Sequence, residues 1–137
     1  MPVELTRAYT PVDGHTVFSR QSPDAASSGR PAVILLHGLG TSSLYMVPTA
    51  ARLAEDFRVY ALDLPGFGHS SKPPHALGLP ALAEVLAGWM SRVGLDRAPV
   101  VGNSFGCQVI AEFGLRYPDR LARAVLQGPT IDAHARR

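Results

Sequence analysis

The sequence contains a single cysteine, Cys107, among its 137 residues. One cysteine excludes a disulfide within the chain, and no cysteines, histidines and carboxylates have the spacing of a metal site. No apolar run approaches the length that a membrane-spanning helix needs. The first residues also lack the basic start and apolar run of a secretory signal. We therefore expect a cytoplasmic protein without a metal, a cofactor or a membrane partner.

The chain also has little excess charge of either sign. The basic residues number 13 and the acidic residues 11, and the basic ones are scattered along the chain. Nucleic-acid binding needs a basic stripe, so no nucleic-acid partner is expected. The glycine-rich stretches lack the Gly-Lys-Ser/Thr ending of a phosphate loop and the three-glycine spacing of a dinucleotide site. A small-molecule substrate remains as the expected ligand.

Apolar residues make up 46% of the chain, which is enough for the core of a single domain over residues 1–137. Residues 5–19 predict an antiparallel hairpin, because Asp13 and Gly14 form a turn signal between two strand-like runs. Predicted strands then alternate with predicted helices, which indicates an α/β fold with a mostly parallel sheet and flanking helices. The later strands are predicted at residues 31–36, 58–63, 98–102 and 121–127, and the helices at about 42–57, 80–94 and 107–117.

Residues 102–106 read Gly-x-Ser-x-Gly, between an apolar strand-like run and a helix-like run. Ser104 would have to take a strained backbone conformation to raise its Oγ above the sheet. Gly102 and Gly106 would then crowd together, and glycine fits there because it has no Cβ. The following helix would direct its positive N-terminal end at the serine. The pattern therefore indicates a nucleophilic serine, and the alternative is a turn without chemistry.

Three motifs follow three successive predicted strands: HGLG at residues 37–40, DLPGFGHS at 63–70 and GNSFG at 102–106. In combination they resemble the α/β-hydrolase superfamily, in particular its bacterial esterases, lactonases and carbon–carbon bond hydrolases. The resemblance covers nearly the whole chain, from the opening hairpin to the strand that ends near Gln127. It implies a hydrolase of the α/β type without singling out a substrate.

The resemblance also implies roles for individual residues. Ser104 would be the nucleophile, and the backbone N–H of Phe105 would receive the oxyanion of the tetrahedral intermediate. A second N–H would come from Leu39, with Gly40 as the alternative donor. His37 and Gly38 would have structural roles in the same loop, as Gly102 and Gly106 would have at the serine.

Members of this superfamily supply an acid and a histidine after the nucleophile in the chain. They are usually longer than this sequence, so we expect the fold to be truncated after about the sixth strand and the triad to be incomplete. Asp132 is a candidate acid, because some members place the acid after this strand, and His134 and His37 are candidate bases. The alternative for Asp132 and His134, which we favour, is the solvated start of a cap or linker segment.

Asp63 also permits two interpretations, because it ends a predicted strand. One is a catalytic carboxylate. The other, which we favour, is a cap of the turn made with Pro65 and Gly66. Cys107 lies one turn beyond Ser104 and is expected to be a small buried helix residue.

Two hypotheses remain for the function. The first is a serine hydrolase that acts on an ester or activated carbonyl of a small organic substrate through Ser104. The second is a non-catalytic relative of such an enzyme that binds a small apolar ligand or a partner chain. The predicted strand from Leu121 to Gln127 would form an open apolar edge, which predicts self-association or pairing with a second chain.

Overall fold

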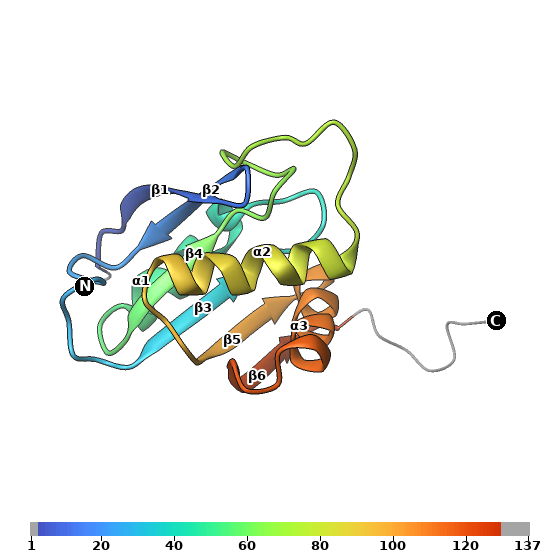
Figure 1. Cartoon of the computed structure of the whole chain (residues 1–137). Helices are drawn as coiled ribbons and strands as arrows, with labels where there is room; N and C mark the ends of the chain where they lie inside the picture. Colours follow the sequence, from blue (N-terminus) through green and yellow to red (C-terminus); the bar gives the residue numbers. More distant parts are fainter. Residues whose placement is uncertain (1–2, 130–137) are drawn as a thin grey trace.

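Six strands form one mixed sheet in the order β1-β2-β4-β3-β5-β6 (Figure 1). The computed structural model describes residues 3–129. The first two strands form an antiparallel hairpin, β2 pairs antiparallel with β4, and the other neighbours are parallel. The expected α/β fold with an opening hairpin and a mostly parallel sheet is therefore confirmed. The strands are β1 (Thr6–Val12), β2 (His15–Gln21), β3 (Ala32–Leu36), β4 (Arg58–Leu62), β5 (Ala98–Asn103) and β6 (Leu121–Gln127).

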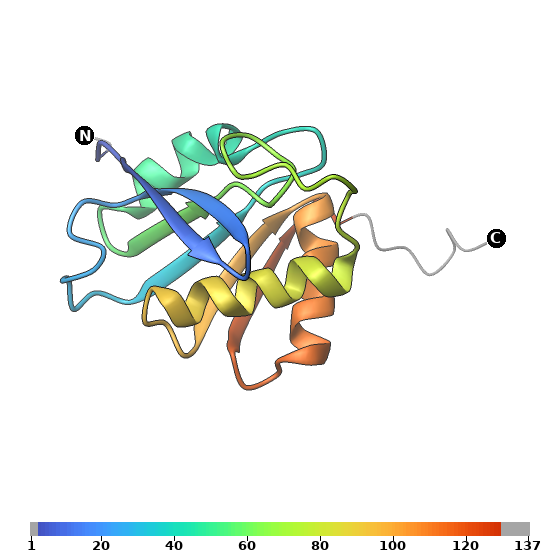
Figure 2. The same cartoon turned by 45° about the horizontal axis from the view of Figure 1, so that its top comes forward.

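Helices cover both faces of the sheet, as Figure 2 shows. One face carries the 3₁₀ helix η1 (Ser43–Met46) and α1 (Val47–Leu53), and the other carries α2 (Leu79–Arg92) and α3 (Phe105–Arg116). Each face therefore has its own apolar cluster. The residues of β3 alternate between the two clusters and are all buried, as expected for a strand enclosed by helices on both sides.

The hairpin is longer than its sequence predicts. Both strands have seven residues, and Asp13 and Gly14 have φ angles of 46° and 83° in the turn between them. Two successive left-handed residues match the twist of a two-residue hairpin, so the turn prediction is confirmed. Pro11 lies inside β1 and is tolerated because β1 is an edge strand of the described sheet.

The helix predicted at residues 42–57 is divided into two shorter pieces. Ser42 accepts a hydrogen bond from the N–H of Leu44 at 3.2 Å and caps the start of η1. Pro48 stands in the first turn of α1. Because proline has no N–H, it cannot continue the hydrogen-bond ladder from the residues before it. The helix therefore restarts at this point, and α1 ends at Leu53.

No helix within residues 3–129 is long and apolar enough to cross a bilayer. The helices α2 and α3 bury one side on the sheet through residues that include Leu86, Trp89 and Phe113. They pack against each other as well as against the strands. This packing fixes the position of the turn between β5 and α3, which contains the candidate nucleophile.

Candidate active site

The three motifs lie at the same edge of the sheet. The strands β4, β3 and β5 are neighbours and run parallel, so their carboxyl ends point in one direction (Figure 1). The loops that follow β3 and β4 contain residues 37–40 and 63–70, and residues 102–106 span the junction of β5 and α3. Ligands of open parallel sheets bind at this edge, because the strand ends leave backbone groups and loop side chains free there.

Ser104 lies at a sharp turn between the last residue of β5 and the first residue of α3. Its backbone has φ 52° and ψ −111°, and residues other than glycine rarely adopt a positive φ angle. The backbone N–H of Ser104 donates to the carbonyl of Gln127 at 2.9 Å, which ties the turn to β6. Its side chain makes no capping bond to α3. The strained conformation predicted for this serine is therefore present.

The two glycines that flank the serine are required by close packing. A Cβ atom at Gly102 would lie 2.6 Å from Ile110 Cδ1 and 2.8 Å from the carbonyl carbon of Gly106. A Cβ atom at Gly106 would lie 2.5 Å from the carbonyl oxygen of Leu36. Real Cβ contacts are longer than these distances, so no side chain fits without a backbone shift. The predicted crowding around Ser104 is confirmed.

The loop after β3 contacts this turn. A Cβ atom at Gly38 would lie 3.4 Å from the Cβ of Ser104, so the two backbones approach closely. Phe105 is the first residue of α3, and its N–H has no acceptor inside the helix. Neither the N–H of Phe105 nor that of Leu39 donates to another backbone carbonyl within residues 3–129. Both N–H groups are therefore unused by the described backbone.

His37 is fully buried, and both of its ring nitrogens have backbone partners. The N–H of Leu64 donates to Nε2 at 3.0 Å, so Nδ1 carries the proton and donates to the carbonyl of Gly38 at 2.8 Å. Burial lowers the pKa of His37 from its ordinary value of 6.5, against smaller opposing effects of the Gly38 carbonyl and the Asp63 charge. The neutral ring has no nitrogen left for Ser104, which agrees with a structural role rather than with the role of base.

Asp63 is completely buried and joins two loops. Its Oδ1 accepts the N–H of Ser43 at 2.7 Å, and its Oδ2 accepts the N–H of His69 at 2.8 Å. The N–H of Gly66 donates to Ser71 instead. Asp63 therefore caps backbone N–H groups, as the favoured interpretation expects, but it bonds His69 and Ser43 rather than the Pro65–Gly66 turn. The bond to Ser43 joins segments 20 residues apart, and no local pattern indicates such a contact.

Cys107 is buried directly behind the serine, in the first turns of α3. Its Sγ donates to the carbonyl of Gly102 at 3.4 Å, and burial raises the pKa of the thiol from its ordinary value of 9.0. A neutral, buried thiol is a poor nucleophile. The expectation of a small buried helix residue is confirmed.

A hollow of about 490 Å³ adjoins the loop after β3. No charged side chain lines this hollow, and Leu44 and Tyr45 expose 63% of their surfaces beside it. An uncharged group would fit such a wall better than an ion. The lining residues are Gly40, Thr41, Ser42, Leu44, Tyr45 and Gly68.

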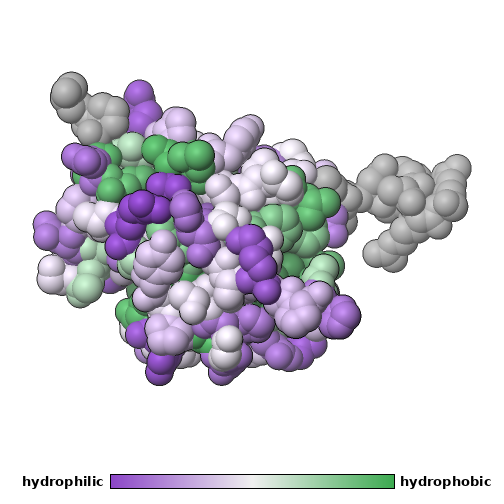
Figure 3. Space-filling model, turned by 90° about the horizontal axis from the view of Figure 1, so that it is seen from above, coloured by the Kyte–Doolittle hydropathy of each residue, from purple (hydrophilic) through white to green (hydrophobic). Residues whose placement is uncertain are grey.

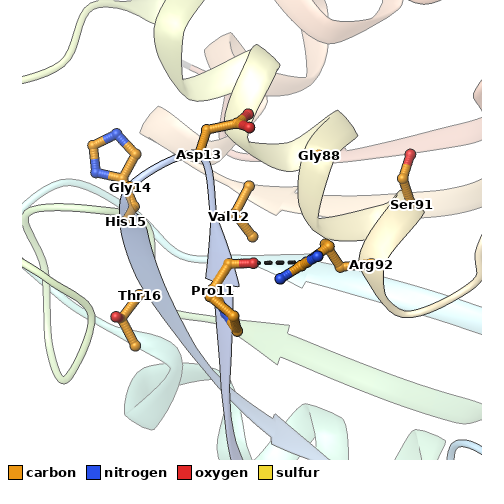
Figure 4. A pocket seen from close by; sticks show the side chains of 9 residues that line it. All are labelled: Pro11, Val12, Asp13, Gly14, His15, Thr16, Gly88, Ser91 and Arg92. Carbon is orange, nitrogen blue, oxygen red and sulfur yellow. Dashed lines mark hydrogen bonds between the residues drawn. The ribbon is translucent and has the colours of Figure 1, made fainter.

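A second hollow, of about 590 Å³, lies between the β1–β2 turn and α2 (Figure 4). Its lining comes from residues 11–16 and from Gly88, Ser91 and Arg92. The Nε of Arg92 donates to the carbonyl of Pro11 at 3.0 Å across one side of this hollow. None of the three motifs contributes to the lining, so this hollow is separate from the serine.

Within the described residues, no group of three or more histidine, cysteine and carboxylate side chains could hold a metal ion. Asp132 and His134, the candidate acid and base, lie outside the described residues. Within the described residues, the structure brings Ser104 together with Gly38, Gly102 and Gly106 and with the loop that contains His37 and Leu39.

The sequence of residues 31–136 matches the family whose model is described as the alpha/beta hydrolase fold. The carboxylesterase YbfK of Bacillus subtilis is 38% identical over 100 residues, which cover 72% of this chain and 34% of that protein. The 2-hydroxy-6-oxo-2,4-heptadienoate hydrolase of Pseudomonas putida is 37% identical over 106 residues, which cover 74% of this chain and 38% of that protein.

Solved structures show the same similarity. The 2-hydroxy-6-oxo-6-phenylhexa-2,4-dienoate hydrolase of Rhodococcus sp. strain RHA1 superposes with a TM-score of 0.84 at 30% identity. The superposition covers 93% of this chain and 47% of that one. The chain spans only part of its curated relatives, from 23% of the length of one to 42% of the length of another.

Proposed function

Since the chain belongs to the alpha/beta hydrolase fold family, we propose that Ser104 is the nucleophile of a hydrolase that cleaves an ester or activated carbonyl of a small organic substrate. The observation that carries this proposal is the left-handed backbone of Ser104 at the junction of β5 and α3. Strained backbone of this kind clusters at active sites. The relatives with carboxylesterase and dienoate hydrolase activities support a carbonyl substrate.

In this proposal, Ser104 Oγ attacks the substrate carbonyl carbon and forms a tetrahedral intermediate. The N–H groups of Phe105 and Leu39 donate to the oxyanion that develops, and the positive end of α3 adds to the same field. Each donor aimed at this charge lowers the barrier by about 3 kcal/mol. Collapse of the intermediate expels the leaving group, and water then releases the acyl group from Ser104.

A serine hydroxyl needs a base to lose its proton. His37 is not available for this task, because both of its ring nitrogens are bonded to backbone groups. We propose that the base lies outside residues 3–129, where His134 is one candidate, and that Asp132 is a candidate for the acid. The hollow beside Leu44 and Tyr45 would hold an uncharged part of the substrate.

A protein that binds a ligand without turnover is the second candidate. The observation in its favour is the complete engagement of His37, which leaves Ser104 without this histidine as a base. The hollow without charged side chains would then bind a small apolar molecule. The two candidates differ in whether Ser104 is activated.

The test is the labelling of Ser104 by a fluorophosphonate probe in the protein purified from its native source. Its intact mass is measured first, and labelled peptides are then identified by mass spectrometry. We expect one phosphonate on Ser104 and none in the matched variant Ser104→Ala, because the reaction needs an activated hydroxyl. An unlabelled wild-type protein with an intact fold would refute the hydrolase proposal and favour the binding protein.

A further inference from the structure

We propose that Asp63 is a positioning residue that holds the loop bearing the second oxyanion donor. This loop, residues 38–42, is called the oxyanion loop below. The inference rests on the proposed function for its consequence in catalysis, and on hydrogen bonds within the described residues for its geometry. It assigns to Asp63 neither contact with the substrate nor a share in proton transfer.

The oxyanion loop is fixed at both ends by the segment that follows β4. At its start, the ring of His37 accepts the N–H of Leu64 at 3.0 Å. At its end, the N–H of Ser43 donates to Asp63 Oδ1 at 2.7 Å. The two anchors on the β4 side are Asp63 and Leu64, which are consecutive residues. Two adjacent residues, Asp63 and Leu64, therefore hold the residues on either side of the five-residue oxyanion loop.

Asp63 is itself held firmly. Its backbone N–H donates to the carbonyl of Phe18 on β2 at 2.9 Å, and its carbonyl accepts the hydroxyl of Ser70 at 2.5 Å. Its second carboxylate oxygen accepts the N–H of His69. No lysine or arginine side chain forms an ion pair with Asp63 within residues 3–129. Both oxygens are therefore occupied by backbone donors, as expected for a carboxylate that orders loops rather than balances a charge.

The rigidity of this arrangement matters because oxyanion donors act by being in place before the charge develops. A donor that is displaced by even a fraction of an ångström loses much of its effect. Inside the loop, Thr41 donates its N–H and its hydroxyl to the carbonyl of Gly38, which closes the loop on itself. With Ser43 bound to Asp63, Leu39 has little freedom to move away from Ser104.

The sharpest test removes the N–H of Ser43 that Asp63 Oδ1 accepts. Ser43→Pro deletes this donor, and the site suits proline because it starts a 3₁₀ helix after an extended residue, Ser42 with φ −153° and ψ −176°. Ser43→Ala is the matched control. It loses the bond between Arg20 Nε and Ser43 Oγ, as the proline variant does, but keeps the N–H.

Two quantities are measured in the native protein and both variants. The first is the fluorophosphonate reaction at Ser104, separated into the binding constant of the probe and the rate of phosphonylation. The second is hydrogen exchange in peptides that cover residues 38–43. We expect Ser43→Pro to slow phosphonylation about tenfold with little change in probe binding and to speed exchange in the loop. Ser43→Ala should change both by less than about twofold.

Asp63→Asn provides a second variant if the proline is not tolerated. Its amide has one oxygen, so either Ser43 or His69 loses its acceptor. Faster exchange at residues 38–43 together with slower labelling supports the proposal, and either change without the other overturns it. Equal labelling rates and equal exchange in Ser43→Pro and Ser43→Ala would also overturn it. A wild-type protein that is not labelled refutes the proposed function instead, and the exchange data then decide whether Asp63 holds the loop.

Discussion

His37 and Asp63 show how single buried residues join the loops of this site. Each uses two side-chain atoms, and each of these atoms is paired with a backbone group. Buried polar side chains of this kind stabilise a fold only when every bond is made. A change at either residue therefore leaves a backbone N–H or carbonyl unpaired inside the protein, at a cost of about 1–3 kcal/mol.

The titration of His37 makes stability depend on pH. Its pKa is about 6.5 in the unfolded chain and lower in the fold, where burial disfavours the charged ring. Above pH 6.5 both states are neutral, and the contribution is fully present. Below it the unfolded chain binds a proton that the folded protein does not, so stability falls by at most about 1.4 kcal/mol per pH unit. We expect the free energy of unfolding to decrease between pH 7.5 and pH 5.5.

Urea titrations at the two pH values measure this change, and His37→Gln serves as the reference because its side chain cannot be protonated. The wild-type protein should lose more stability than the variant over the same interval. The same pH dependence in both proteins would show that His37 does not contribute to it.

Local spacing made part of the site predictable residue by residue. Gly102 and Gly106 lie two residues before and two residues after Ser104, so their crowding follows from the sequence itself. The role of Asp63 did not follow, because Ser43 belongs to another loop, and both Ser43 and His69 bind Asp63 through backbone atoms. Every residue except proline has a backbone N–H, so the sequence does not indicate which N–H a carboxylate binds, and only the structure shows such a contact.

At the level of elements, the turn from β5 to α3 depends on how closely α3 approaches β3. The first turn of α3 passes directly over the carbonyl groups of Leu36 and His37, and Gly106 is the residue at the crossing. A side chain there would push the helix away from the sheet. Because Ser104 immediately precedes α3, its position would change with the helix.

Gly106→Ala tests this approach. The added methyl group would lie 2.5 Å from the carbonyl oxygen of Leu36, so we expect a loss of about 1–3 kcal/mol of unfolding free energy, measured by urea denaturation. Gly29→Ala is a suitable control, because a Cβ at Gly29 has no atom within 4 Å. The control should lie within about 0.5 kcal/mol of the wild type. A neutral Gly106→Ala variant would contradict the close approach.

The elements themselves were predicted well where an apolar run was uninterrupted. The strands β3 to β6 agree with their predictions to within one residue at each end. For β3, burial on both faces of the sheet demands continuous apolar residues, whereas β6 is largely exposed. The segment after residue 42 was less predictable. Its apolar spacing suits one helix, but Pro48 interrupts the hydrogen bonds and divides it.

For the whole molecule, the two edges of the described sheet differ. The edge strand β1 carries Arg7 and Pro11, which discourage pairing with another chain. At the other edge, Val125 and Leu126 of β6 expose 50% and 44% of their surfaces. Hydrophobic residues also gather in separate areas of an otherwise largely hydrophilic face in Figure 3. β6 is the last strand in the described sheet, and the exposure of Val125 and Leu126 agrees with the open apolar edge predicted from the sequence.

We expect the 137-residue chain to self-associate through β6, because its outer backbone groups have no strand partner within residues 3–129. Light scattering at tens of micromolar should give a mass above that of a monomer. Val125→Lys should reduce this association, since a charge at an exposed edge position opposes pairing with a second copy. A monomeric wild-type chain that binds no surface-sensitive dye would contradict the prediction.

Arg7→Lys on β1 is the matched control for this experiment. It keeps the charge on the opposite edge and should leave the association unchanged. If both variants weaken association equally, the contact does not involve β6.

The hydrogen bond from Ser104 to Gln127 has a consequence for the order of events during synthesis. A chain leaving the ribosome presents the serine well before the strand that holds its backbone N–H. Until β6 has emerged and paired with β5, the turn at Ser104 lacks this support, although every residue of the motif is already present. We therefore expect the strained turn at Ser104 to reach its final conformation only after β6 has paired with β5.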